Sequence, residues 1–407
     1  MNSQAVEYEP VSVKEVLSEM KDTAELLIDL SYSAVLHGSD EVAAEVLELE
    51  ARMDLLQLQG RMSLLMAARN PEDAEQLAPV LGVIGAAEKI SNAAGDIAKV
   101  VIEDIGLPEA IRGALPEATE TLVRATVADE SAYADRTLGE VNMETETGVR
   151  ALAIRRTSAT GKRRWITNPT HESRIEPGDV LLLRGNESGV ATVFETVTGS
   201  PYEPPAATEE PIEDLERAVD SIVLMKNMSE LAVDLAYGSV LFDSEGVAEE
   251  VLELEAEVDA LKSRFEAWTL RAAGRVEDPI SLRGLMHIAS ATEVISDAAL
   301  EISEGVLRGL TAHPVVAAAF EESDEVIVRV RVAADSPLTG TTLGGQELKT
   351  ETGMRVLAVR RGDDEWIVSP GAETALEADD LLIAKGTRAG ASRLGDLAGD
   401  TLDFEDE

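Results

Sequence analysis

The chain alternates between segments whose apolar residues recur every three or four positions and segments with short continuous apolar runs. Segment 13–36, a second one that includes 42–56 and is broken before Pro71, and segment 71–106 are of the first kind, which is typical of amphipathic helices. In the middle one, spacings of four and three separate Val42, Val46, Leu49, Met53 and Leu56. Gly38 and Pro71 mark the breaks between these segments. Three long helices with short connections predict an antiparallel bundle.

The following segment has a different pattern. Four short apolar runs, 122–127, 149–155, 164–167 and 180–184, are bounded by turn residues, as strands are. A short helix is expected at 137–141 and a closing helix at 189–197. The order β-α-β-β-β-α, with a hairpin in the middle, predicts a compact α+β module.

Almost the whole of this unit occurs a second time. A shift of 205 positions carries Val46 to Val251, Tyr32 to Tyr237 and the sequence TETG at 145–148 to the same sequence at 350–353. Beyond the hairpin the shift is 201, because Trp165 corresponds to Trp366. The sequence is therefore a tandem duplication of a unit of close to 200 residues.

The predicted fold class is α+β, built as two repeats of a three-helix bundle followed by a β-α-β-β-β-α module. The predicted domains are a helical bundle at 11–115, a β-rich module at 119–198, a second bundle at 212–321 and a second module at 324–395. Residues 199–211 contain a cluster of prolines and acids and are expected to form an exposed linker.

The composition narrows the functional classes. The formal charge is −43, from 78 acids and 35 bases among 407 residues. Acids spread over the whole chain are typical of proteins that work in high salt, which screens their mutual repulsion. A charge of this sign argues against sequence-independent nucleic-acid binding. The chain has no cysteine, and neither a signal peptide nor an apolar run long enough to span a membrane is recognisable, so a cytoplasmic protein is expected.

Acids at helical spacing form the first candidate site. Residues four apart share one helix face, so carboxylates from two facing helices of a bundle could chelate a hard cation. The alternative is that these acids are hydrated at the edge of the packed face. The candidate metal ligands are Glu50, Asp54, Glu88 and Asp96 in the first copy and Glu255, Asp259, Glu293, Asp297 and Glu301 in the second.

A cluster of bases forms the second candidate site. Five bases flank the central hairpin of the first module in an otherwise acidic chain, and such a cluster is suited to the phosphates of a nucleotide or another anion. The alternatives are ion pairs with acids of a partner or of a neighbouring module, and a hydrated surface hairpin. These candidate anion ligands are Arg155, Arg156, Lys162, Arg163 and Arg164. No nucleophile–base pattern and no phosphate-binding loop is present, so the chain is not expected to be an enzyme.

The β-rich module resembles the C-terminal domain of the TrkA family, the regulator-of-potassium-conductance C-domain. The residues that carry the resemblance are TLGE at 137–140, GVRALAI at 148–154 and EPGDVLL at 176–182, with TLG at 342–344, GMRVLAV at 353–359 and EADDLL at 377–382 in the second copy. The resemblance implies a cytoplasmic regulator of cation transport, most often of potassium. In that family the domain dimerises and binds a small ligand, which is cyclic di-AMP in several members.

The helical bundle resembles the PhoU family, through Glu50 and Asp54 on one helix and Glu88 and Asp96 on the next. This resemblance implies a regulator docked on a transporter, with divalent or iron-type metal on acidic motifs. Together the two resemblances predict a ligand-sensing regulator, as a single chain or a homodimer, at the inner face of the membrane on a cation transporter or channel. The alternatives are a metal-binding regulator of phosphate transport and a purely structural adaptor. No G-x-G-x-x-G motif of a dinucleotide-binding domain is present.

Overall fold

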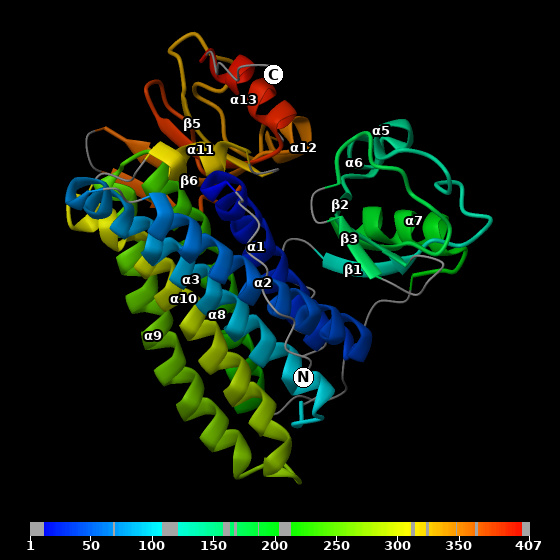
Figure 1. Ribbon diagram of the computed structural model, residues 1–407. Coiled ribbons are helices and arrows are strands. Elements are labelled where there is room, and N and C mark those ends of the chain that lie inside the picture. The colour runs from blue at the N-terminus through cyan, green and yellow to red at the C-terminus, as the bar shows by residue number, and fades with distance from the viewer. Residues whose placement is uncertain are drawn as a thin grey trace.

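Six long helices form the body of the protein (Figure 1). The computed structural model describes residues 12–67, 70–107, 121–157, 163–166, 169–185, 187–202, 213–310, 314–322, 325–346, 348–362 and 365–400. The first copy supplies α1 (Val13–His37), α2 (Asp40–Ala67) and α3 (Pro71–Ile102). The second supplies α8 (Glu213–Leu241), α9 (Glu245–Ala273) and α10 (Arg283–Leu307), with a short 3-10 turn, η2 (Pro279–Leu282), before α10.

Both bundles share one hydrophobic core, so they form a single six-helix body. The core runs without a break through buried residues of α1, α2, α3, α8, α9 and α10, and α3 packs against α10 along the contact between the copies. A buried hydrogen bond of 2.5 Å between the hydroxyls of Tyr32 and Thr292 also joins the copies. A further helix, α11 (Pro314–Glu322), packs on α1.

Each bundle is followed by a module with a four-stranded antiparallel sheet. The first module consists of β1 (Thr121–Thr126), α5 (Leu138–Val141), α6 (Met143–Thr147), β2 (Arg150–Thr157), β3 (Arg163–Ile166), β4 (Val180–Gly185) and α7 (Glu187–Thr198). The second consists of β5 (Val326–Arg331), α12 (Leu348–Thr352), β6 (Arg355–Arg361), β7 (Glu365–Val368), β8 (Leu381–Gly386) and α13 (Arg388–Ala398).

The two sheets have the same topology. Their strand orders are β1-β4-β2-β3 and β5-β8-β6-β7, and each has a register shift at the equivalent place, Ala151/Ala153 and Val356/Ala358. Each module also has its own small core. The predicted fold class, two copies of a helical bundle followed by an α+β module, is confirmed. The short helix predicted at 137–141 is present as α5, and a further short helix, α6, follows it before the second strand.

Buried charges join the second module to both bundles. The ammonium of Lys385, on β8, lies 2.6 Å from a carboxylate oxygen of Asp234 on α8. It also lies 3.1 Å from Glu25 on α1 and 3.3 Å from Glu325, which directly precedes β5. Burial disfavours the charge of Lys385, but these three carboxylates outweigh that cost and raise its pKa.

The surrounding carboxylates have further partners. Asp234 is 2.5 Å from Arg355 on β6, and Glu325 is 2.6 Å from Arg150 on β2. Burial alone would raise the pKa of Glu325, but Lys385, followed by Arg150, outweighs it and lowers that pKa. The ion pairs therefore connect both modules to the helical body through one group of buried charges.

Within the described ranges, no helix combines the length and the hydropathy that crossing a bilayer requires.

Replacing Lys385 with Met should destabilise the protein by about 3–5 kcal/mol, because the buried Asp234 and the partly buried Glu25 and Glu325 lose a shared cation. Urea unfolding in molar KCl measures the change. The control is Arg308→Met, which removes an exposed ion pair with Glu304 at the end of α10 and should cost about 0.5 kcal/mol or less. Equal effects of the two substitutions would contradict the structural role assigned to Lys385.

Candidate functional site

A cavity of about 820 Å³ lies where both helical bundles meet the two modules. Asp29 and Tyr32 reach it from α1, and Lys226 and Glu230 from α8. The second module contributes residues of α12 and β6 and the loop at 369–372, and the first contributes Arg184 from β4. A cavity of this size at a junction of domains is typical of small-molecule sites.

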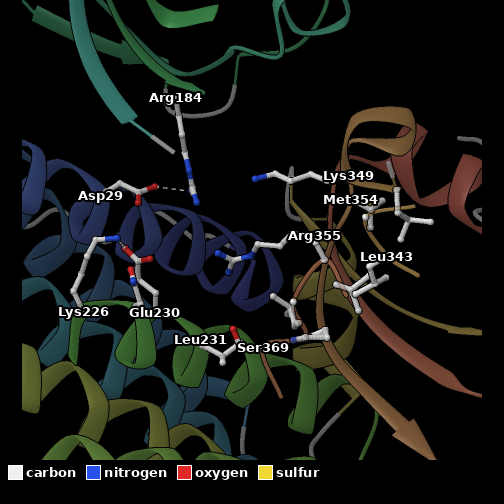
Figure 2. A pocket seen from close by; sticks show the side chains of 18 of the residues that line it. Asp29, Arg184, Lys226, Glu230, Leu231, Leu343, Lys349, Met354, Arg355 and Ser369 are labelled. Atoms are coloured by element: carbon white, nitrogen blue, oxygen red, sulfur yellow. Dashed lines mark hydrogen bonds and ion pairs between the residues drawn. The ribbon is translucent and has the colours of Figure 1, made fainter. Parts of the chain in front are cut away.

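Basic groups from three different elements converge on this cavity. Figure 2 shows the nitrogen-bearing ends of Arg184, Lys349 and Arg355 pointing toward the same space. Arg184 is also 2.9 Å from Asp29, and Arg355 is paired with Asp234 behind the cavity. With Lys226, which is 2.5 Å from Glu230, four bases and two acids line the cavity among the described residues.

The rest of the lining is largely apolar. Leu343, Leu348 and Met354 lie on the side of the second module, and Leu36 and Leu231 lie on the side of the helices. Figure 2 shows Leu343 and Met354 on the far side of the basic groups from Asp29. This arrangement can hold an oxyanion by charge-assisted hydrogen bonds and cover an apolar portion of the same molecule.

Asp29 is an acid of the cavity whose pKa is perturbed. Burial raises its pKa to about 6, and the neighbouring Arg184 opposes this shift without cancelling it. The equivalent acid of the second copy, Asp234, has two cationic partners instead of one, and its pKa is lowered although burial acts against its charge. The two copies therefore hold equivalent carboxylates in different electrostatic environments.

The bases predicted as anion ligands lie elsewhere, on the hairpin of the first module. Arg155 forms an ion pair with Glu45, a buried residue of α2. Arg164 is exposed on β3 opposite Arg156. Lys162 lies outside the described residues, and Arg163 is described only in its backbone, as the first residue of β3. Whether this hairpin binds an anion stays a prediction.

Arg156 has a structural partner that occurs in both copies. Its guanidinium donates two hydrogen bonds, of 2.9 and 2.7 Å, to the two carboxylate oxygens of Asp179. In the second module, Arg361 holds Asp380 in the same way, at 3.0 and 2.7 Å. The hydrogen bonds to Asp179 raise the pKa of Arg156. This paired geometry ties the edge of the hairpin to the turn before the last strand of each module.

In the first bundle, bases lie among the predicted metal ligands. Lys99 lies 2.9 Å from Asp96 and 3.8 Å from Glu50. Partial burial raises the pKa of Glu50, and Lys99 opposes the shift while Asp96 and Asp54 add to it. Glu88 accepts a hydrogen bond from Gln57 and lies 3.4 Å from Arg61.

In the second bundle, three of the predicted ligands come together. Glu255 and Asp259 on α9 and Asp297 on α10 each offer an oxygen within 4.8 Å of the others. Partial burial and the mutual repulsion of these acids raise the pKa of Glu255 and Asp297. Glu293 is instead paired with Lys262, and Glu301 with Lys89 of the first copy. Carboxylate oxygens grouped in this way suit a hard divalent cation.

The bases of the cavity were not identified by the sequence analysis. Arg184, Lys226, Lys349 and Arg355 are isolated in the sequence and come together only when the second bundle meets both modules. A position-by-position comparison of the two copies could have pointed to one of these bases, because Lys349 corresponds to an acid, Glu144, in the first copy. Clustering along the chain, which led to the hairpin, misses a site of this kind.

Family comparisons agree with the duplicated architecture. The family model described as the PhoU domain matches residues 17–101 and 222–306. The family model described as the TrkA-C domain matches residues 122–198 and 327–399. The two families alternate along the chain and together cover more than half of it.

Solved structures give only distant likenesses. The "Crystal Structure of the GsuK RCK domain" is 14% identical, with 69% of this chain and 64% of that chain covered and a TM-score of 0.18. "GsuK channel bound to NAD" is 14% identical (70% and 53% covered), and "GsuK Channel" is 12% identical (79% and 70% covered), both with TM-scores of 0.18. The chain thus spans less than two thirds of the first two, and scores this low carry no functional information. No curated protein matches the sequence.

Replacing Asp29 with Asn should change how stability depends on pH. A pKa raised to about 6 means that the folded chain binds this proton more tightly than the unfolded chain. The resulting stabilisation is present below about pH 4 and is lost as the pH rises through 6. As the pH rises from 4 to 6, the free energy of unfolding of the variant should therefore increase relative to that of the wild type by up to about 3 kcal/mol. Urea unfolding at several pH values measures this gain.

The control is Asp220→Asn at an exposed position of α8, which should follow the pH dependence of the wild type. A constant difference in stability between the Asp29→Asn variant and the wild-type protein over this range would show that Asp29 does not have the raised pKa.

Proposed function

Because the chain belongs to the PhoU and TrkA-C domain families, with each domain present twice, we propose that it is a regulatory protein of cation transport. The proposed ion is potassium, and the proposed partner is a membrane transporter or channel that the protein contacts from the cytoplasmic side. In this proposal the chain binds a small ligand and changes its docking, and it catalyses no reaction.

The position of the cavity supports this proposal. It is lined by α1 and α8 of the helical body and by α12 and β6 of the second module. A ligand there contacts both kinds of domain at once, so it stabilises the arrangement in which they lie as they do here. Such a ligand shifts the population of docking states only if it binds one arrangement more tightly than another.

Deleting the gene should change rubidium uptake, used as a tracer for potassium, and leave phosphate uptake unaltered. Both fluxes are measured in cells grown at high KCl, and re-expression of the wild-type chain is the control for restoration. Affinity capture after crosslinking in native membranes should recover a cation transporter or channel. Altered phosphate uptake with unaltered rubidium uptake would contradict the proposal and favour the alternative below.

The second candidate function is a metal-binding regulator of phosphate transport, and the carboxylate group of the second bundle favours it. Glu255, Asp259 and Asp297 supply three oxygens close enough for one ion. In the first bundle, Asn92 occupies the position that corresponds to Asp297. Lys99 lies 3.8 Å from Glu50, the counterpart of Glu255, and partly neutralises it. The counterpart of Lys99 in the second copy is Glu304. This difference points to the second bundle as the place for a hard divalent cation.

Purified protein incubated with Mn²⁺ and desalted should retain about one ion per chain, because the three carboxylates of the second bundle each offer an oxygen within 4.8 Å of the others. The double substitution Glu255→Ala and Asp259→Ala should abolish retention. The matched control is Glu50→Ala with Asp54→Ala in the first bundle, which should leave retention unaltered. Elemental analysis of the desalted samples gives the readout, and retention that survives the first pair of substitutions would exclude this site.

A further inference from the structure

The cavity has a smaller counterpart at the equivalent place of the first copy. That counterpart has a volume of about 50 Å³, compared with about 820 Å³. Seven of its lining positions map onto lining positions of the large cavity through the repeat shifts of 205 and 201: residues 22, 25, 26, 150, 151, 152 and 169 correspond to 227, 230, 231, 355, 356, 357 and 370. The duplication therefore provides an internal comparison for each position of the large cavity.

Two of the differences between the copies remove negative charge from the large cavity. Asp22 of the small cavity corresponds to Asn227 of the large one. Lys349, which lines the large cavity, corresponds in sequence to Glu144. Together the two differences make the second copy more positive by three formal charges at these positions. Both act in the same direction, in a chain with a net charge of −43.

The described linings of the two cavities accordingly have opposite charge. Asp22, Glu25, Asp29 and Glu325 supply four acids to the small cavity, against the two bases Arg150 and Arg184. The large cavity has four bases and two acids. In an acidic protein, bases gathered around a cavity with apolar walls provide a local attraction for anions that the molecule as a whole repels.

We propose that the large cavity binds a small organic oxyanion, a phosphate or a carboxylate attached to an apolar body, and that the duplicated chain has one such site. Arg184, Lys349 and Arg355 contact the oxyanion, since their nitrogens converge there (Figure 2). Leu343, Val356 and Pro370, which line the cavity and keep part of their surface accessible, cover the apolar body. The regulatory use of this ligand rests on the proposed function, but its binding does not.

The purified full-length chain is titrated with phenyl phosphate, benzoate and inorganic phosphate at constant ionic strength in KCl. Calorimetry and the shift in melting temperature report binding without any transporter, so a failed uptake experiment and a failed titration are distinguishable. Phenyl phosphate or benzoate should bind saturably with one site per chain, and inorganic phosphate should bind more weakly because it lacks an apolar body. The relative affinities of phenyl phosphate and benzoate identify the preferred anionic group.

Two variants restore the charges of the first copy. Lys349→Glu should weaken binding about tenfold or more, and Asn227→Asp about threefold, because each adds repulsion at the oxyanion. Both positions are exposed at the mouth of the cavity, so the fold should persist. Arg264→Glu makes the same charge change as Lys349→Glu on the exposed face of α9 and should leave the affinity within about twofold of the wild type.

Three results would overturn the proposal. One is the absence of saturable binding of all three anions up to about 10 mM, where a site with several charge-assisted contacts should be occupied. Another is wild-type affinity in the Lys349→Glu variant. The last is an equal loss of affinity in Arg264→Glu, which would show that net charge alone governs the binding.

Discussion

The arrangement of the two bundles and the second module depends on a buried cation held among three carboxylates. Lys385 brings together Asp234 of one bundle, Glu25 of the other and Glu325 at the entry to its own module. A buried ion remains charged only when partners offset the loss of its hydration. Each of these groups therefore requires the others to be in place, and a displaced module would leave several charges without compensation. Apolar packing is not directional, so by itself it would fix the position of the module on the bundles less precisely than these ion pairs do.

The same kind of interaction forms one wall of the large cavity. Asp29 and Arg184 occupy the positions that correspond to Asp234 and Lys385, and they line the cavity instead of filling a closed junction. The same ion pair thus holds a module against a bundle and lies within reach of a ligand in the cavity. An anion placed beside Arg184 competes with Asp29 for the guanidinium and so acts directly on a contact between module and bundle. This continuity gives a physical route from an occupied cavity to a change in domain docking.

The fold could be predicted from the sequence to a large extent, while the cavity could not. Apolar periodicity and the repeat shifts of 205 and 201 were enough to predict two bundles, two modules and their order. These features depend on local sequence patterns, and each pattern occurs twice. The clustering of bases along the sequence pointed to the hairpin around Arg155 and Arg156. In the structure these two side chains form ion pairs with Glu45 and Asp179. The cavity joins residues from α1, β4, α8 and β6, and this proximity depends on domain packing that no local pattern contains. The acids of the second bundle were identified because helical spacing already places Glu255 beside Asp259.

The shared core of the six helices has a consequence for how the two halves can diverge. In a dimer of identical chains, every substitution occurs on both sides of the symmetry axis, so a Glu to Lys exchange at one cavity also alters the other. Here the halves are covalently joined and packed into one body, and each position can vary by itself. One cavity is small and lined mostly by acids, and its counterpart is large and has more bases than acids in its lining. The molecule has the geometry of a symmetric pair without its symmetry, so the proposed ligand would meet one large cavity in each chain instead of two equal ones.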